Sequence, residues 1–181
     1  MLVALNVITT AEAHTTTTIM GGIVWLLNCA ATHNNATLHY HSSDMVLHFV
    51  RDASCLCKER ARSQDGGHFF LADRLVDNGE KPPTLHTNNG TIHTLFQIIK
   101  TVMSSAAKAK IGANFLKSKD ALTIRTTLEE IRHPQPHTPR QVYNTTAVGF
   151  SNDTINQKWP KAIDMRFYWI RYCIRQGHFK I

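Results

Sequence analysis

Asp52 is the residue whose type and position best fit catalysis, because it is an acid at the end of an otherwise apolar segment that reads as a central strand. Enzymes that cleave phosphodiesters with two metal ions bring several carboxylates together, since two dications about 3.5–4 Å apart must be neutralised. An aspartate at a strand end can instead cap a turn. Partner acids on other elements would distinguish a metal ligand from a capping residue.

The two elements expected to supply partner acids do not contain them. The helical segment 104–131 begins with Lys108 and Lys110, and the short strand predicted next, Gln141–Tyr143, offers a tyrosine. A tyrosine, with a reference pKa of about 10, is not an ionised ligand near neutral pH. Asp52 therefore stands without the carboxylates that a two-metal site requires.

The cysteines and histidines also lack a metal-binding pattern. Cys55 and Cys57 form C-x-C, which no second pair follows, so the four cysteines are expected to be free thiols in a reducing compartment. His39 and His41 would share one face of a strand, but no carboxylate completes a ligand set there. We expect no resident metal ion or other cofactor.

Length and composition predict an ordinary domain with an anionic partner. The chain has 181 residues, 43% of them apolar, and a net charge of +7. That apolar fraction permits a packed core, and the charge favours nucleic acid, although an ordinary basic protein has the same composition. The longest apolar run, Ile19–Ala31, is too short and too interrupted to cross a membrane. The first residues lack the basic start of a signal peptide, so an intracellular, cytoplasmic or nuclear location is expected.

The order of elements predicts an α/β fold. Residues 1–36 read as a helical linker and residues 37–181 as one domain with three strands, a helical segment, a strand, a helix and a last strand. Gly66 and Gly67 read as a hairpin connection between the first two strands, and segment 104–131 as two helices with a break near Lys117–Asp120. Three antiparallel strands with parallel additions, flanked by helices, make a mixed sheet.

The segment Lys158–Ile181 carries the strongest pattern. Apolar residues recur at helical spacing among cations, Gly177 ends the helix, and an alternating strand begins at His178. The cations assigned to a nucleic-acid-facing surface are Lys158, Lys161, Arg166 and Arg171. A solvated basic face is the alternative. Because the chain ends within the strand, we expect the last strand and a final helix to be incomplete.

Several ordered motifs resemble the RNase H region of copia-type retrotransposon polyproteins, which follows the reverse transcriptase. The segments that carry the resemblance are RDASCLCKERARSQDGGHFFLAD, SSAAKAKIGA, HPQPHTPRQVYNTTAVG and QKWPKAIDMRFYWIR. Residues up to Phe49 resemble the link between reverse transcriptase and this domain. The resemblance implies an RNase H-like fold and Mg²⁺-dependent cleavage of RNA in RNA–DNA hybrids.

Transferred residue by residue, the family's four acidic ligands survive only at the first position. Asp52 in Arg51-Asp52-Ala53-Ser54 matches the first acid, Lys110 stands at the second and Tyr143 at the third, and the fourth position would follow Ile181. A lysine about 4 Å from a dication costs about 4 kcal/mol for each unit-charge pair at an effective dielectric constant of about 20. No intact metal site is therefore expected.

Three functional hypotheses follow. The first is a degenerate, truncated RNase H-like remnant, a pseudoenzyme left by a transposable element. The second is a non-catalytic basic module that still binds RNA, DNA or their hybrid. The third, weaker hypothesis is an active nuclease in which Asp52 works with unexpected ligands.

Overall fold

The computed structural model describes residues 4–5, 8–9, 16–74, 89–103, 105–139 and 161–180; of residues 58–59, 161–164 and 167 it describes the backbone alone. The chain divides into two units, Met1–His39 and Tyr40–Ile181, which are described separately.

The first unit contains helix α2 (Thr17–Thr32), which lies within residues 1–36, the segment predicted to be helical. Thr16 caps its start, because the Thr16 hydroxyl accepts a hydrogen bond from the Ile19 N–H at 3.4 Å. None of its residues is buried, and Trp25 and Leu27 are exposed. None of the described helices is long and apolar enough to cross a bilayer.

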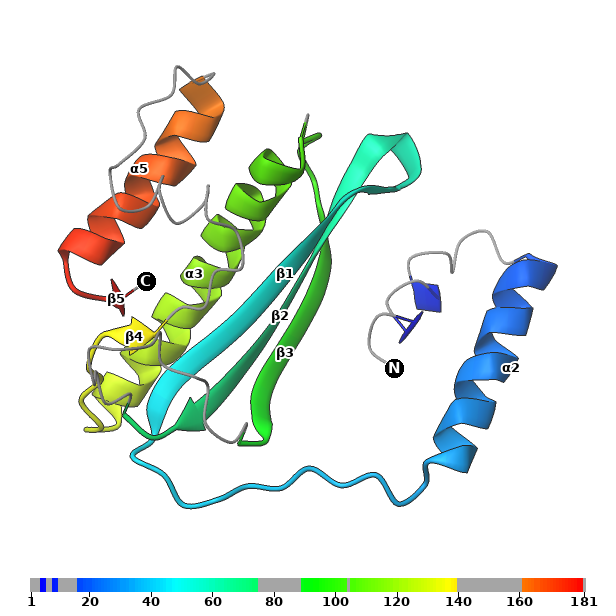
Figure 1. Ribbon diagram of the computed structural model, residues 1–181, viewed down its shortest axis with the longest axis horizontal. Helices are drawn as coiled ribbons and strands as arrows, with labels where there is room; N and C mark the ends of the chain where they lie inside the picture. Colours follow the sequence, from blue (N-terminus) through cyan, green and yellow to red (C-terminus); the bar gives the residue numbers. More distant parts are fainter. Residues whose placement is uncertain are drawn as a thin grey trace, which may run out of the picture. The chain divides into compact units, whose positions relative to one another are not determined.

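The second unit is built on three antiparallel strands in the order β1-β2-β3 (Figure 1). They are β1 (Val46–Lys58), β2 (Arg62–Ala72) and β3 (Thr91–Ile99). A 3₁₀ turn, η2 (Glu59–Ala61), joins the first two. The three predicted antiparallel strands are thus confirmed, and the fold is α/β.

The prediction of a hairpin connection at Gly66-Gly67 is wrong, because both glycines lie inside β2. A Cβ atom on Gly66 would come within 2.5 Å of the Phe96 ring, and one on Gly67 within 2.8 Å of Lys117 Cδ. The glycines therefore allow side chains to approach the strand closely on both faces of the sheet. In the sequence, a Gly-Gly pair with this role looks the same as one that forms a turn.

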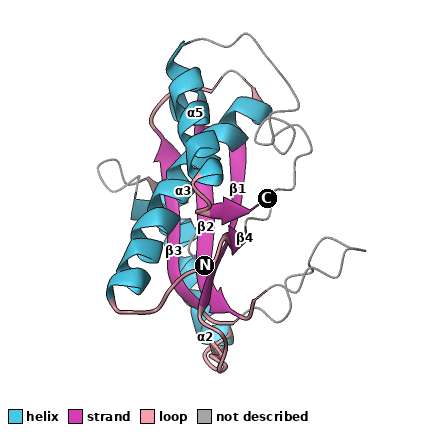
Figure 2. Ribbon diagram, turned by 90° about the vertical axis from the view of Figure 1, so that its left-hand side faces the viewer, coloured by secondary structure: helices cyan, strands magenta, loops and turns pink. Residues whose placement is uncertain are grey.

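Helix α3 (Ala106–Glu130) runs without a break, so the prediction of two helices is also wrong. Ser105 caps its start by accepting the Lys108 N–H at 3.2 Å. The predicted break rested on the polar residues 117–120, but Lys117 and Ser118 are buried on the side facing the sheet. Figure 2 shows α3 lying against one face of the three strands.

The chain continues through β4 (Thr138–Pro139), α5 (Lys161–Arg175) and β5 (Phe179–Lys180). Gly177 has a φ of +78°, which confirms it as the residue that ends the helix, and the strand predicted from His178 is found as β5. Residues 140–160, which include the strand predicted at Gln141–Tyr143, lie outside the described residues.

The expected single mixed sheet is replaced, in the part of the chain described, by two sheets. β4 pairs in parallel with β5, and β4 lies beside β1 without joining its hydrogen-bond ladder (Figure 1). The side chain of Gln135 takes the place of the ladder: its Oε1 accepts the Leu47 N–H at 2.9 Å and its Nε2 donates to Met45 O at 3.1 Å. The flanking prolines, Pro134 and Pro136, have no N–H with which to extend a ladder.

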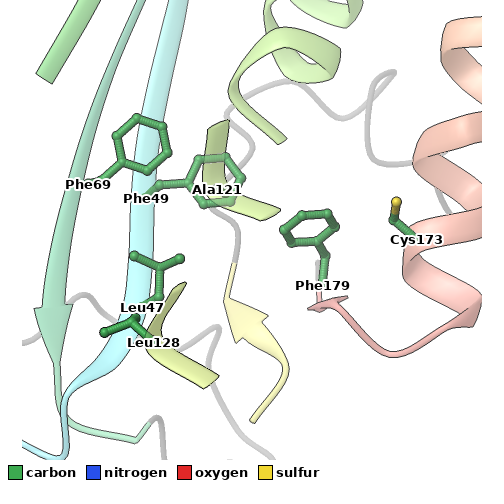
Figure 3. Packing of buried hydrophobic residues seen from close by; sticks show 7 residues of the cluster. All are labelled: Leu47, Phe49, Phe69, Ala121, Leu128, Cys173 and Phe179. Atoms are coloured by element: carbon green, nitrogen blue, oxygen red, sulfur yellow. The ribbon is translucent and has the colours of Figure 1, made fainter. Parts of the chain in front are cut away.

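The core lies between the sheet, α3 and α5 (Figure 3). Alternate residues of β1 and β2 point toward α3, as the period of two in the sequence predicts. Phe49 stacks on Phe69 with ring centroids 5.7 Å apart and meets Phe179 edge-on at 6.1 Å. Phe179 thereby joins β5 to the first half of β1.

Candidate functional site

Asp52 lies in the middle of β1 rather than at its end, and it is exposed. One carboxylate oxygen, Oδ1, accepts the N–H of the next residue, Ala53, at 2.8 Å. Across the sheet Asp52 is paired with Gly66, and Gly66 with Phe96. Since a Cβ on Gly66 would touch the Phe96 ring, Asp52 shares the face of Phe96.

The neighbouring residue, Arg51, points to the other face of the sheet. Its cross-strand partner is Gly67, whose Cβ position is filled by the Lys117 side chain of α3. Arg51 Nη1 donates to Lys110 O at 3.0 Å, and only 6% of Arg51 is exposed. Of these two adjacent residues, the cation therefore faces α3 and the acid faces away.

Burial lowers the pKa of Arg51 to about 10, and the charges of Asp65 and Asp52 oppose this shift only in part. Among the described residues, the Nε and Nη2 atoms of Arg51 are buried without a hydrogen-bond partner. The guanidinium is thus held against α3 by its bond to Lys110 O, at a net electrostatic cost.

The structure does not bring together the residues at the family's first and second acid positions. Asp52 is on the face of the sheet away from α3, whereas Lys110 belongs to α3 and contacts β1 through its own carbonyl oxygen. Tyr143, at the third position, lies outside the described residues. Among the residues that are described, no group of three His, Cys, Asp or Glu side chains could hold a metal ion.

The sequence analysis missed a buried ion pair under α3. Lys117 Nζ lies 3.1 Å from Asp65 Oδ2 and 3.5 Å from Asp120 Oδ2, and the side chains of Lys117 and Asp65 are fully buried. Gln97 Nε2 also donates to Asp65 Oδ2, at 3.3 Å. Burial raises the pKa of Asp65, and the charge and hydrogen bond of Lys117 partly offset that rise. The signal for this pair in the sequence was Gly67: because Gly67 has no side chain, the Lys117 side chain can pass over β2 to reach Asp65.

A second structural cation, Arg125 of α3, holds the segment that leads to β4. It donates to the carbonyl oxygens of Gln135 and Pro136, and its Nη2 lies 3.1 Å from Glu129 Oε1. Burial lowers the pKa of Arg125, against the opposing effect of Glu129. Arg125 therefore has a structural role, holding the segment before β4, and not a role at the protein surface.

The four cations predicted to face nucleic acid are not equivalent. Arg166 Nη1 donates to Thr101 Oγ1 at 3.2 Å, and its guanidinium lies 5.8 Å from the centre of the Phe115 ring. Arg171 is half-buried. Lys161 is described by its backbone alone, and Lys158 lies outside the described residues. Arg166 fastens α5 to Thr101, which follows β3, and to Phe115 of α3, and these contacts limit the reach of its guanidinium toward a partner.

The exposed side of α5 carries residues that are not among the predicted site residues. Met165, Tyr168 and Tyr172 are 76%, 62% and 60% exposed, respectively, and Arg175 is also exposed. Their spacing of three and four residues is the signal in the sequence that they share one side of the helix.

Comparisons of the chain with protein-family models, with curated proteins and with solved structures give no match. A function for this chain is therefore proposed from its own residues and their geometry.

Proposed function

We propose that this chain is an RNase H-like domain, related to those of copia-type retrotransposons, that no longer cleaves RNA–DNA hybrids. One observation carries the proposal: Asp52 lies on the face of the sheet opposite α3. A two-metal mechanism requires carboxylates from different elements to converge on one point. The one acid that matches the family's pattern points away from the helix that would supply the next.

The order of elements supports the relationship to RNase H-like domains. Three antiparallel strands are followed by a long helix, a short strand beside β1, a second helix and a parallel strand. That order agrees with the arrangement that the sequence motifs imply.

The charge beside Asp52 supports the loss of cleavage. β1 presents Arg51, not a carboxylate, to the first turns of α3, and the residue it contacts there is Lys110. The buried guanidinium of Arg51 at this junction opposes the binding of a dication there by like-charge repulsion.

A cleavage assay tests this proposal directly. The full chain is incubated with an end-labelled RNA–DNA hybrid in Mg²⁺ and, separately, in Mn²⁺, and the products are resolved on a denaturing gel. We expect no cleavage above that given by an Asp52→Asn variant prepared in the same way. Cleavage by the unaltered chain that Asp52→Asn abolishes would overturn the proposal, and it would support the third hypothesis of an active nuclease.

A second function, non-catalytic binding of nucleic acid, is favoured by the charge of α5 and the residues after it. From Lys161 to Lys180 the chain contains five cations, Lys161, Arg166, Arg171, Arg175 and Lys180, and one acid, Asp164. A basic segment of this kind suits a phosphate backbone.

A salt titration tests this second function. Affinity for labelled nucleic acid is measured by fluorescence anisotropy over a range of salt concentrations, and we expect it to fall steeply as salt rises, because phosphate contacts release counterions. Negligible binding even at low salt would refute this function and would leave the loss of cleavage unaffected.

A further inference from the structure

A stripe of exposed side chains runs along α5. Met165, Tyr168, Tyr172 and Arg175 follow one another at intervals of three, four and three residues, which places them on one side of a helix. The opposite side of α5 carries Ile170 and Cys173, both buried. The stripe therefore faces away from the core that fixes the helix in place.

The composition of this stripe is unusual for the outer side of a surface helix. Such a side is normally charged or polar, whereas here two tyrosines and a methionine, each more than half exposed, are consecutive along the stripe. Single exposed apolar residues need no explanation, but a continuous row of them marks an interaction surface.

The surrounding charge identifies the chemistry of the partner. The stripe ends in Arg175, and Arg166 and Arg171 lie on the same helix, whose acid, Asp164, directly precedes Met165. Aromatic rings interleaved with an excess of cations are a combination that binds nucleic-acid strands, because bases stack on the rings and phosphates pair with the cations.

Whether the partner is single-stranded or duplex nucleic acid depends on which bases the tyrosine rings can reach. In a duplex the faces of the bases are covered by their neighbours, so a side chain on a helix surface can stack only on bases that are unpaired and splayed out. Tyr168 and Tyr172 are one helical turn apart, with about 5–6 Å expected between Cβ atoms at this spacing, so they can engage neighbouring nucleotides.

We propose that the stripe Met165–Tyr168–Tyr172–Arg175 binds single-stranded nucleic acid, with bases stacked on the two tyrosines and a phosphate at Arg175. This inference rests on the nucleic-acid-binding function proposed above and specifies its partner. It assigns α5 a partner different from the duplex hybrid that the family resemblance implies.

The test compares two probes on the full chain at low salt: a fluorescein-labelled oligothymidylate and a labelled RNA–DNA hybrid of the same length. The oligothymidylate is expected to bind more tightly than the hybrid. The double variant Tyr168→Ala/Tyr172→Ala is expected to weaken oligothymidylate binding by at least about tenfold, as loss of base stacking does elsewhere. The variant Tyr168→Phe/Tyr172→Phe keeps the rings and is expected to retain the affinity.

A matched control removes an exposed aromatic ring elsewhere. Trp25 is 64% exposed on α2, and Trp25→Ala is expected to leave the affinity unchanged. Circular dichroism checks that each variant keeps its helix content. If the double variant loses helix content, the binding measurements are made with the single variants Tyr168→Ala and Tyr172→Ala instead.

Each contrary outcome has a distinct meaning. Unchanged oligothymidylate affinity in the alanine variants would overturn the role of the stripe and leave nucleic-acid binding by other residues standing. Tighter binding of the hybrid than of the single strand would overturn the choice of partner. No binding of either probe by the unaltered chain would refute both this inference and the binding function on which it rests.

Discussion

The Nζ atom of Lys117 lies 3.1 Å from Oδ2 of Asp65, and neither side chain is exposed to solvent. Lys117 comes from the middle of α3 and Asp65 from β2, so the pair joins the two main layers of the second unit. The lysine reaches the carboxylate by crossing Gly67, which has no side chain to block it.

Replacing Lys117 by methionine is expected to lower the free energy of unfolding by about 3–5 kcal/mol, because Asp65 would remain as a buried charge without its cation. Adding Asp65→Asn should recover a large part of that loss, since the stranded charge is removed. Urea denaturation measures both variants. Lys119→Met is the control, because Lys119 is exposed on the same helix. Equal effects at the two lysines would contradict the importance of the buried pair.

Gly67→Ala is expected to destabilise the second unit by about 1–3 kcal/mol, because the new Cβ would lie 2.8 Å from Lys117 Cδ in a packed interior. The midpoint of thermal unfolding measures the change. Gly21→Ala on α2 is the matched control: its Cβ would meet nothing within 4 Å, and alanine favours a helix. A Gly67→Ala variant as stable as the unaltered chain would show that Lys117 can take another path.

Arg51→Met is expected to stabilise the fold near neutral pH by about 1–3 kcal/mol, because burial disfavours the charged guanidinium. The folded pKa of about 10 lies below the ordinary value for arginine, so this cost is fully present at neutral pH. As the pH rises through about 10 the folded state releases the proton before the unfolded state does, and the cost is progressively lost.

The advantage of Arg51→Met over the unaltered chain should therefore shrink as the pH is raised from about 9 to about 11. Paired urea titrations at these pH values measure the difference. Lys100→Met, at an exposed position, supplies the control for removal of a cation. A constant difference across this range would argue against a depressed pKa for Arg51.

Lys110→Glu is expected not to restore cleavage of an RNA–DNA hybrid, although it returns an acid to the family's second position. The reason is geometric: a glutamate on α3 and Asp52 on the far face of the sheet do not converge on one metal site. The gel assay in Mg²⁺ and Mn²⁺ is the measurement. Cleavage by the Lys110→Glu variant, removed again by Asp52→Asn, would show that the two residues can meet.

The sequence by itself determined the local elements with strong periodicity. The three strands, the end of α5 at Gly177 and the start of β5 all follow from backbone preferences and alternation, which are properties of neighbouring residues. The proposed resemblance, which assigns Lys110 to the position of an acid, also rests on the sequence alone.

Tertiary structure decided what the polar and small residues do. Gly66, Gly67 and Lys117 look like turn and helix-break signals locally. In the structure Gly67 and Lys117 let α3 approach the sheet, and Gly66 leaves room for the Phe96 ring on the other face. Likewise, alternation predicted that Asp52 and Arg51 face opposite sides of β1, but only the position of α3 decided that the cation, and not the acid, faces the helix. Such assignments depend on contacts between residues far apart in the chain, which local pattern does not encode.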